Sequence, residues 1–249
     1  MNKIIRSSDA FKFFEHNYWT YYRELENEFL LTQRYVDFDI RNNGTFSIEY
    51  LKLYQAVCSE IDVIGKAMAS IVNSDFQADD RTNNILKWWY EIQDVFYVVD
   101  GPFTYNNNKP TPQPFAMSDY ICCLNDSIVI KPWEEFKTEV YHDKNNSLRY
   151  RLVNGAKIPG WWTDYNKVKH NRIIANAETD NYRKANFGNL SKAFAALYIL
   201  ERSYMDMVGT NDDLQSFLDF SVLFVKKKRY TYMETELLFN TKLGRVDSE

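Results

Sequence analysis

Cysteine, glycine and proline are scarce in this chain of 249 residues, and long apolar runs are absent. The three cysteines, Cys58, Cys122 and Cys123, are an odd number with one adjacent pair. This pattern is a poor disulfide framework and lacks the Cys-x-x-Cys spacing of zinc sites, so we predict reduced thiols and no metal site. Cys58 lies in an apolar helical pattern, which favours a packed side chain over a nucleophile.

Signals for export and for membrane insertion are also lacking. The N-terminal residues have no continuous apolar stretch before a small-residue cleavage site, which a signal peptide needs. No segment approaches the roughly 18 consecutive apolar residues of a membrane span. The sequence therefore predicts a cytoplasmic protein without a membrane partner.

Motifs for common cofactors and hydrolases are missing as well. GxxxxGK[ST], GxGxxG and GxSxG do not occur, so P-loop, Rossmann and hydrolase-elbow functions have no support. The formal net charge is −4, from 30 basic and 34 acidic residues. That balance argues against a wholly basic surface for duplex DNA, although a local basic patch is compatible with it. We expect no cofactor and no duplex DNA partner.

Aromatic residues, in contrast, are abundant: 18 Tyr, 17 Phe and 6 Trp stand against 8 Gly and 6 Pro. Low Gly and Pro favour long helices over turn-rich β architecture. Many tyrosines suit the margin of a helical core, because the ring packs while the hydroxyl reaches water or a partner. The composition thus predicts a mainly all-α chain that buries a sizeable core.

Three helices are expected in the N-terminal part. Ser7–Asp9 can cap the first helix and Ser47 the second, after a break at 37–44. Apolar residues then recur three or four positions apart, which indicates one buried face per helix. These residues are Phe11, Phe14, Tyr18, Tyr21, Leu25 and Phe29 in the first helix, and Ile48, Leu51, Tyr54, Val57, Ile61, Ile64 and Met68 in the second. A third helix is predicted over about 82–98.

The character of the chain changes near residue 100. Residues 101–115 hold four of the six prolines and three successive asparagines, which cannot continue a helix. We predict an irregular insertion or lid over 100–160, within a single helical domain of residues 1–249. Short strands are expected at 128–130 and 148–153, and a short helix at 133–141.

Helical spacing returns in the C-terminal part. Helices are predicted over 161–177, 189–208 and from Asp212 or Asp213 to about Val225. Together these elements indicate a helical bundle of about five or six helices with a mixed, short-stranded insertion.

The chemically densest segment is Trp161–Arg172, with the sequence WWTDYNKVKHNR. On a helix Asn166 and His170 share a face, and a hydrogen bond between them can set the imidazole tautomer. Lys169 and Arg172 beside this histidine can hold an anion such as phosphate. Tyr165 and the two tryptophans can stack on a base.

The role of His170 in this segment has two interpretations. Glu60 and Asp62 on the second predicted helix are candidate acidic partners of His170. Alternatively, His170 is a satisfied histidine at a helix–helix contact, with Lys169 and Arg172 on a solvated face. One sequence does not decide between a site and a structural histidine.

The run YNKVKHNR (Tyr165–Arg172), followed by NFGNLSKAFAALYIL (Asn186–Leu200), resembles bacterial helical-bundle proteins of the HEPN group. The resemblance implies a helical bundle, often a homodimer, of toxin–antitoxin or phage-defence systems. It also implies a protein that binds RNA or a nucleotide, since many members are metal-independent ribonucleases.

The ribonuclease signature of that group, Arg followed after four to six residues by His, is absent from this chain. His170 and Arg172 occur in the reverse order, two residues apart, which places them about 200° apart around a helix. No catalytic residue is therefore predicted, and whether the chain is an enzyme stays open.

A second hypothesis comes from a different class of function. The aromatic stripes can form a helical dimer or partner surface of a non-catalytic interaction or scaffold protein. It predicts that Trp161 and Trp162 matter for association while His170 is dispensable.

Overall fold

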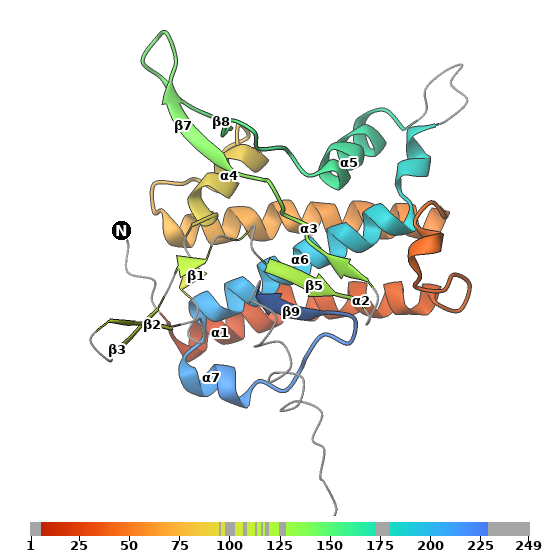
Figure 1. The fold of residues 1–249 in the computed structure, drawn as a ribbon, viewed down its shortest axis with the longest axis horizontal. Coiled ribbons are helices and arrows are strands. Elements are labelled where there is room, and N and C mark those ends of the chain that lie inside the picture. The colour runs from red at the N-terminus through yellow and green to blue at the C-terminus, as the bar shows by residue number, and fades with distance from the viewer. Residues whose placement is uncertain are drawn as a thin grey trace, which may run out of the picture.

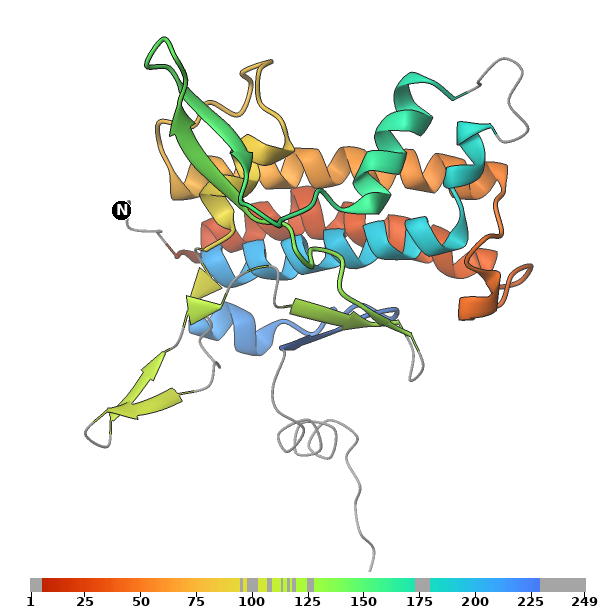
Figure 2. The same cartoon turned by 45° about the horizontal axis from the view of Figure 1, so that its top comes forward.

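Two long helices, α3 (Ile48–Val72) and α6 (Phe187–Val208), lie side by side at the centre of the protein (Figure 1). Beside them runs an unbroken helical segment made of α1 (Ser8–Phe14), η1 (Glu15–Trp19) and α2 (Thr20–Thr32), as Figure 2 shows. The computed structural model describes residues 6–94, 96–97, 103–106, 109–112, 114–115, 117, 120–124, 128–172 and 180–228. These helices confirm the prediction of a mainly helical chain.

Local capping starts the long helices where the sequence indicates. The side chains of Ser7, Ser47 and Asn186 each accept a hydrogen bond from the backbone N–H three residues later, at 3.1, 3.1 and 3.0 Å. A cap of this kind satisfies one of the amide groups that the first turn leaves unpaired. The predicted starts at Ser7 and Ser47 are confirmed.

A π-helical turn, η1, corrects the apolar face predicted for the first helix. The backbone N–H of Thr20 bonds to the carbonyl of Glu15, five residues back. The wider turn rotates everything that follows it by about one residue. As a result Trp19 and Tyr22 are buried, whereas the predicted Tyr21 is 43% exposed and Tyr18 only half-buried. The other predicted residues of this face are buried as expected, namely Phe11, Phe14, Leu25 and Phe29.

The third helix is shorter than predicted. Helix α4 covers only Ile85–Ile92, not 82–98. Asn84 sets its start, because the side-chain oxygen accepts from two backbone N–H groups of the first turn. Beyond the helix, strand β1 (Phe96–Tyr97) pairs with β4 (Pro114–Phe115). Pairing with a distant strand is not visible in the local sequence.

Short antiparallel strands make up much of the described chain between 100 and 160, as expected. They are β2 (Phe103–Asn106), β3 (Lys109–Pro112), β5 (Tyr120–Cys123), β6 (Val129–Ile130), β7 (Thr138–His142) and β8 (Leu148–Leu152). The helix predicted at 133–141 is wrong. Glu135 has φ 62°, a left-handed conformation that a helix cannot contain, and β7 follows it. The predicted strands at 128–130 and 148–153 are present as β6 and β8.

The C-terminal elements also depart from the predicted lengths. Helix α5 covers Gly160–His170, and residues 173–177 of its predicted range lie outside the described chain. After η4 (Asn181–Lys184) and α6 comes α7 (Asn211–Ser216). The helix predicted to reach Val225 therefore ends early.

Strand β9 (Val225–Lys228) follows and pairs with β5, which ties this end of the described chain to the inserted segment.

Indole rings join the inserted segment to the bundle. Trp161 donates through Nε1 to the carbonyl of Pro132 at 2.9 Å, and Trp89 donates to the carbonyl of Phe136 at 3.1 Å. The rings of Trp89 and Trp133 lie 4.5 Å apart. Aromatic packing of this kind adds to the burial of apolar area.

Helix α4 sits close to α3 for a simple steric reason. A Cβ at Gly65 would lie 2.7 Å from the ring of Trp88, so only glycine permits this approach. Within the described part of the chain, none of the helices combines the length and apolar character that a membrane crossing requires.

Candidate functional site

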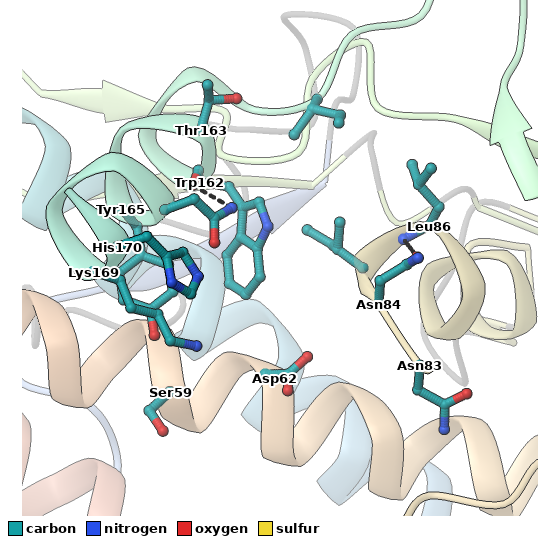
Figure 3. Close-up of a pocket in the computed structure, with 13 residues that line it drawn as sticks. Ser59, Asp62, Asn83, Asn84, Leu86, Trp162, Thr163, Tyr165, Lys169 and His170 are labelled. Atoms are coloured by element: carbon teal, nitrogen blue, oxygen red, sulfur yellow. Dashed lines mark hydrogen bonds between the residues drawn. The ribbon is translucent and has the colours of Figure 1, made fainter. Parts of the chain in front are cut away.

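A groove of about 600 Å³ lies between α3, the start of α4 and α5 (Figure 3). It brings together side chains that are more than 100 residues apart in the sequence. The lining residues are Ser59, Asp62, Asn83, Asn84, Ile85, Leu86, Ile158, Trp162, Thr163, Tyr165, Asn166, Lys169 and His170. The groove thus combines apolar walls with amide groups and a few charged side chains, which is the usual composition of a small-molecule site.

The α5 wall supplies an ammonium group and an imidazole to the groove. Lys169 and His170 are exposed side chains in the last turn of α5. The Lys169 Nζ lies 5.6 Å from the centre of the Tyr165 ring, which is itself buried. A cation over an aromatic face is attracted by the ring quadrupole. This contact holds the ammonium group at the edge of the groove.

The α3 wall supplies a carboxylate, that of Asp62 (Figure 3). One of its oxygens accepts from Trp88 Nε1 at 3.1 Å, and the other pairs with Lys66 one helical turn away. The side chain is 34% exposed. Two fixed donors therefore orient this carboxylate from α3 and α4.

The wall opposite α5 is built from the two residues before α4, as Figure 3 shows for Asn84. Asn84 caps the helix with its side-chain oxygen. Asn83 donates through Nδ2 to the carbonyl of Gln77 at 2.6 Å, while its Oδ1 is buried with no hydrogen-bond partner among the described residues. Ser59, Asn83 and Asn84 were not foreseen as lining residues, and only the capping pattern at Asn84 singles any of them out in the sequence.

Most of the predicted site residues converge in this groove. Tyr165, Asn166, Lys169 and His170 line it together with Asp62. In place of the expected hydrogen bond to His170, the Asn166 amide donates to the Trp162 carbonyl at 3.2 Å, within its own helix. Burial of His170 between helices, the alternative interpretation, is wrong because this side chain is exposed.

Arg172 does not belong to the groove. Helix α5 ends at His170, and Asn171 follows with φ −144° and ψ 64°, outside the helical region. Arg172 is exposed, and its carbonyl accepts a hydrogen bond from the backbone N–H of Tyr182. This arginine thus comes after the end of the helix and is not among the described residues that line the groove.

Glu60 is not an acidic partner of His170 either. Residues two positions apart in the sequence are separated by about 200° around a helix axis, so Glu60 and Asp62 point to opposite sides of α3. Glu60 is buried on the side of α3 that faces α6. Its charge raises the pKa of the Glu201 carboxyl group and of the Tyr18 and Tyr21 hydroxyls. Of the two predicted acidic partners, only Asp62 faces α5.

The two tryptophans of α5 are core residues. Trp161 is 3% exposed and Trp162 is 7% exposed, with the ring of Trp162 at the groove. The hypothesis of a dimer surface, made from the sequence, placed the contacts between subunits on these two rings. Because both are buried, they are not available as an exposed association surface in this structure.

Buried carboxyl groups on the other side of α3 form a second polar cluster. Glu201 is fully buried, and neither of its carboxyl oxygens has a hydrogen-bond partner among the residues that the structure describes. Burial and the nearby Glu60 raise the pKa of Glu201 well above its usual range. Burial raises the pKa of Glu60 to about 7. Both groups therefore favour the neutral, protonated form in the folded protein.

This shift predicts a pH dependence of stability. The pKa of Glu60 rises from about 4.5 in the unfolded chain to about 7 in the fold. The folded state then binds more protons than the unfolded state between these values. Stability should fall as pH rises through this window, by at most about 1.4 kcal/mol per pH unit from this group.

The measurement is urea unfolding of the native chain and of Glu60→Gln at several pH values. The variant should match the native chain near pH 4.5 and exceed it in free energy of unfolding at pH 8. Glu49→Gln, at an exposed position of the same helix, is the control and should leave the pH profile unchanged. A Glu60→Gln profile parallel to that of the native chain would contradict the assignment.

No protein-family model, curated protein or solved structure matches this chain. Interpretation of the groove therefore depends on its geometry and chemistry. In the described ranges, no group of three or more His, Cys, Asp or Glu side chains comes together in a way that could hold a metal ion. The Cys58 thiol, 0% exposed, has its pKa raised well above the usual range by burial, which disfavours the nucleophilic thiolate.

Proposed function

We propose that the groove between α3, α4 and α5 binds a nucleotide, either free or as one unit of an RNA strand. The observation that carries the proposal is the placement of Lys169 and His170 at one wall of a groove whose other lining residues are apolar, amide and hydroxyl side chains and the Asp62 carboxylate. A cavity of about 600 Å³ lies in the range that small-molecule and cofactor sites occupy.

The phosphate and the base of a nucleotide each find suitable side chains in the groove. Lys169 provides three N–H donors for phosphate oxygens, and His170 provides a donor beside it. The half-buried Leu86 and the small exposed parts of Ile85 and Trp162 line the groove and offer apolar contact to a base. Stacking or apolar contact with a base contributes about 1–3 kcal/mol and tolerates different sequences.

The proposal is one of binding, and it extends the resemblance to the HEPN group. Within that group the expected roles are in phage defence or toxin–antitoxin systems. Lys169 and His170 share the groove while Arg172 lies outside it. This arrangement supports recognition of an anion by the Lys169 ammonium group with the His170 imidazole beside it, and it assigns no general acid or base.

Titration calorimetry with nucleoside monophosphates and a short single-stranded RNA tests the proposal. The double variant Lys169→Ala, His170→Ala should bind at least about 10-fold more weakly, because each charge-assisted hydrogen bond contributes about 1.5–3 kcal/mol. Both residues are exposed, so the fold should persist, which circular dichroism can verify.

Arg172→Ala is the matched control, because it removes an exposed cation from the same segment outside the groove. Its affinity should stay within about 2-fold of that of the native chain. Absence of binding by the native chain, or an equal loss in Arg172→Ala, would overturn the proposal.

A further inference from the structure

The groove is not uniformly cationic, and this asymmetry bears on which ligand it accepts. Lys169 and His170 belong to the wall from α5, whereas Asp62 rises from α3 below them (Figure 3). Asp62 is the one carboxylate among the lining residues. A ligand that fills the groove must therefore place an anionic part against α5 and a hydrogen-bond donor against α3.

The Asp62 carboxylate retains capacity for a ligand. Each carboxylate oxygen has about two lone-pair sites. Trp88 and Lys66 occupy one site on each oxygen, and about a third of the side chain is still exposed. These two contacts also fix the direction of the carboxylate, so little freedom has to be lost when a ligand donor binds.

We infer that the groove selects nucleotides whose base carries an exocyclic amino group, which donates a hydrogen bond to Asp62. The inference rests on the proposed nucleotide function and adds a specificity to it. A carboxylate is an acceptor only, and it pairs with the amino group of cytosine in protein–nucleic acid recognition. A base with a carbonyl at the same place would put its carbonyl oxygen next to the Asp62 carboxylate. Both groups are acceptors, so no hydrogen bond would form.

Orientation follows from the same charges. Asp62 repels a phosphate group, while Lys169 and His170 attract it. The phosphate is therefore placed at the end of α5 and the amino edge of the base over α3. Asn84 lies on the wall opposite α5, and its side-chain oxygen caps α4, which leaves its Nδ2 group to donate to an acceptor atom of the base.

Calorimetry on the native chain tests this without any substitution. Adenosine and inosine monophosphates differ by an amino group or a carbonyl at one ring position, and so do cytidine and uridine monophosphates. The amino member of each pair should bind about 10-fold more tightly. Equal affinities within each pair would overturn the inference and leave the proposed function standing, whereas absence of binding by all four would overturn both.

Asp62→Asn then identifies the residue responsible. An amide can present either a donor or an acceptor, so the preference should shrink to within about 3-fold. Glu49→Gln is the matched control, because it removes an exposed carboxylate of the same helix that does not line the groove, and it should retain the preference. Thermal melting of both variants verifies the fold, and loss of the preference in Glu49→Gln as well would count against direct recognition by Asp62.

Discussion

Glu26→Ala is expected to lower the free energy of unfolding by about 3–5 kcal/mol and to release residues 217–224 from helix α2. Glu26 is fully buried in α2 and paired with Arg23. Its carboxylate accepts hydrogen bonds from the Tyr22 hydroxyl, at 3.0 Å, and from the Ser221 hydroxyl. Removing one charged partner of such a network leaves the others buried and unpaired, which is the costly case.

The same carboxylate explains why the chain is extended after α7. The backbone N–H groups of Val222 and Leu223 donate to Glu26 at 3.3 and 3.1 Å. Those groups would otherwise be free to continue a helix. Asp219 adds a second attachment, since its carboxylate accepts from Trp19 Nε1 at 2.8 Å. Residues 217–224 are therefore held to α2 by side chains about 195 residues away in the sequence.

Urea unfolding measures the stability change, and amide hydrogen exchange at residues 222 and 223 reports the release. Glu28→Ala is the control, because Glu28 is exposed on the same helix and should change stability by less than about 0.5 kcal/mol. A Glu26→Ala protein as stable as Glu28→Ala, with unchanged protection at 222 and 223, would show that the network does not hold this segment.

Glu201→Met is expected to act in the opposite direction and to stabilise the protein by about 1–4 kcal/mol. Glu201 is fully buried in α6, and its carboxyl oxygens have no partner in the described part of the chain. Burying such a group costs free energy even in the protonated form. Methionine is unbranched and adaptable, so it can fill the same space without a polar atom to desolvate.

The gain should appear as a higher midpoint of thermal unfolding at pH 7. Glu201→Gln is the informative comparison, because it keeps the volume and a polar group and should recover less of the stability. A loss of more than about 1 kcal/mol in Glu201→Met would mean that the carboxyl group has a stabilising partner. Because Glu201 lies on the side of α3 away from the groove, nucleotide binding should be unchanged in either variant.

Much of the candidate site could be predicted because it belongs to one segment. Tyr165, Asn166, Lys169 and His170 are neighbours on one helix, and helical spacing alone places them together. The same reasoning failed for Arg172, because the helix ends before it, at the non-helical conformation of Asn171. The contribution of Asn83 and Asn84 was missed, since nothing local relates them to α5.

The sequence by itself determined the helical class, the capped helix starts at Ser7 and Ser47 and the polar character of the α5 segment. These features arise from interactions within a few residues, which composition, capping and spacing report directly. Tertiary structure alone decided the shift of buried residues at η1, the non-helical course of residues 217–224 and the meeting of Asp62 with Lys169 and His170. Each of these depends on contacts between distant segments, and their free energies outweigh the small local preferences of the chain.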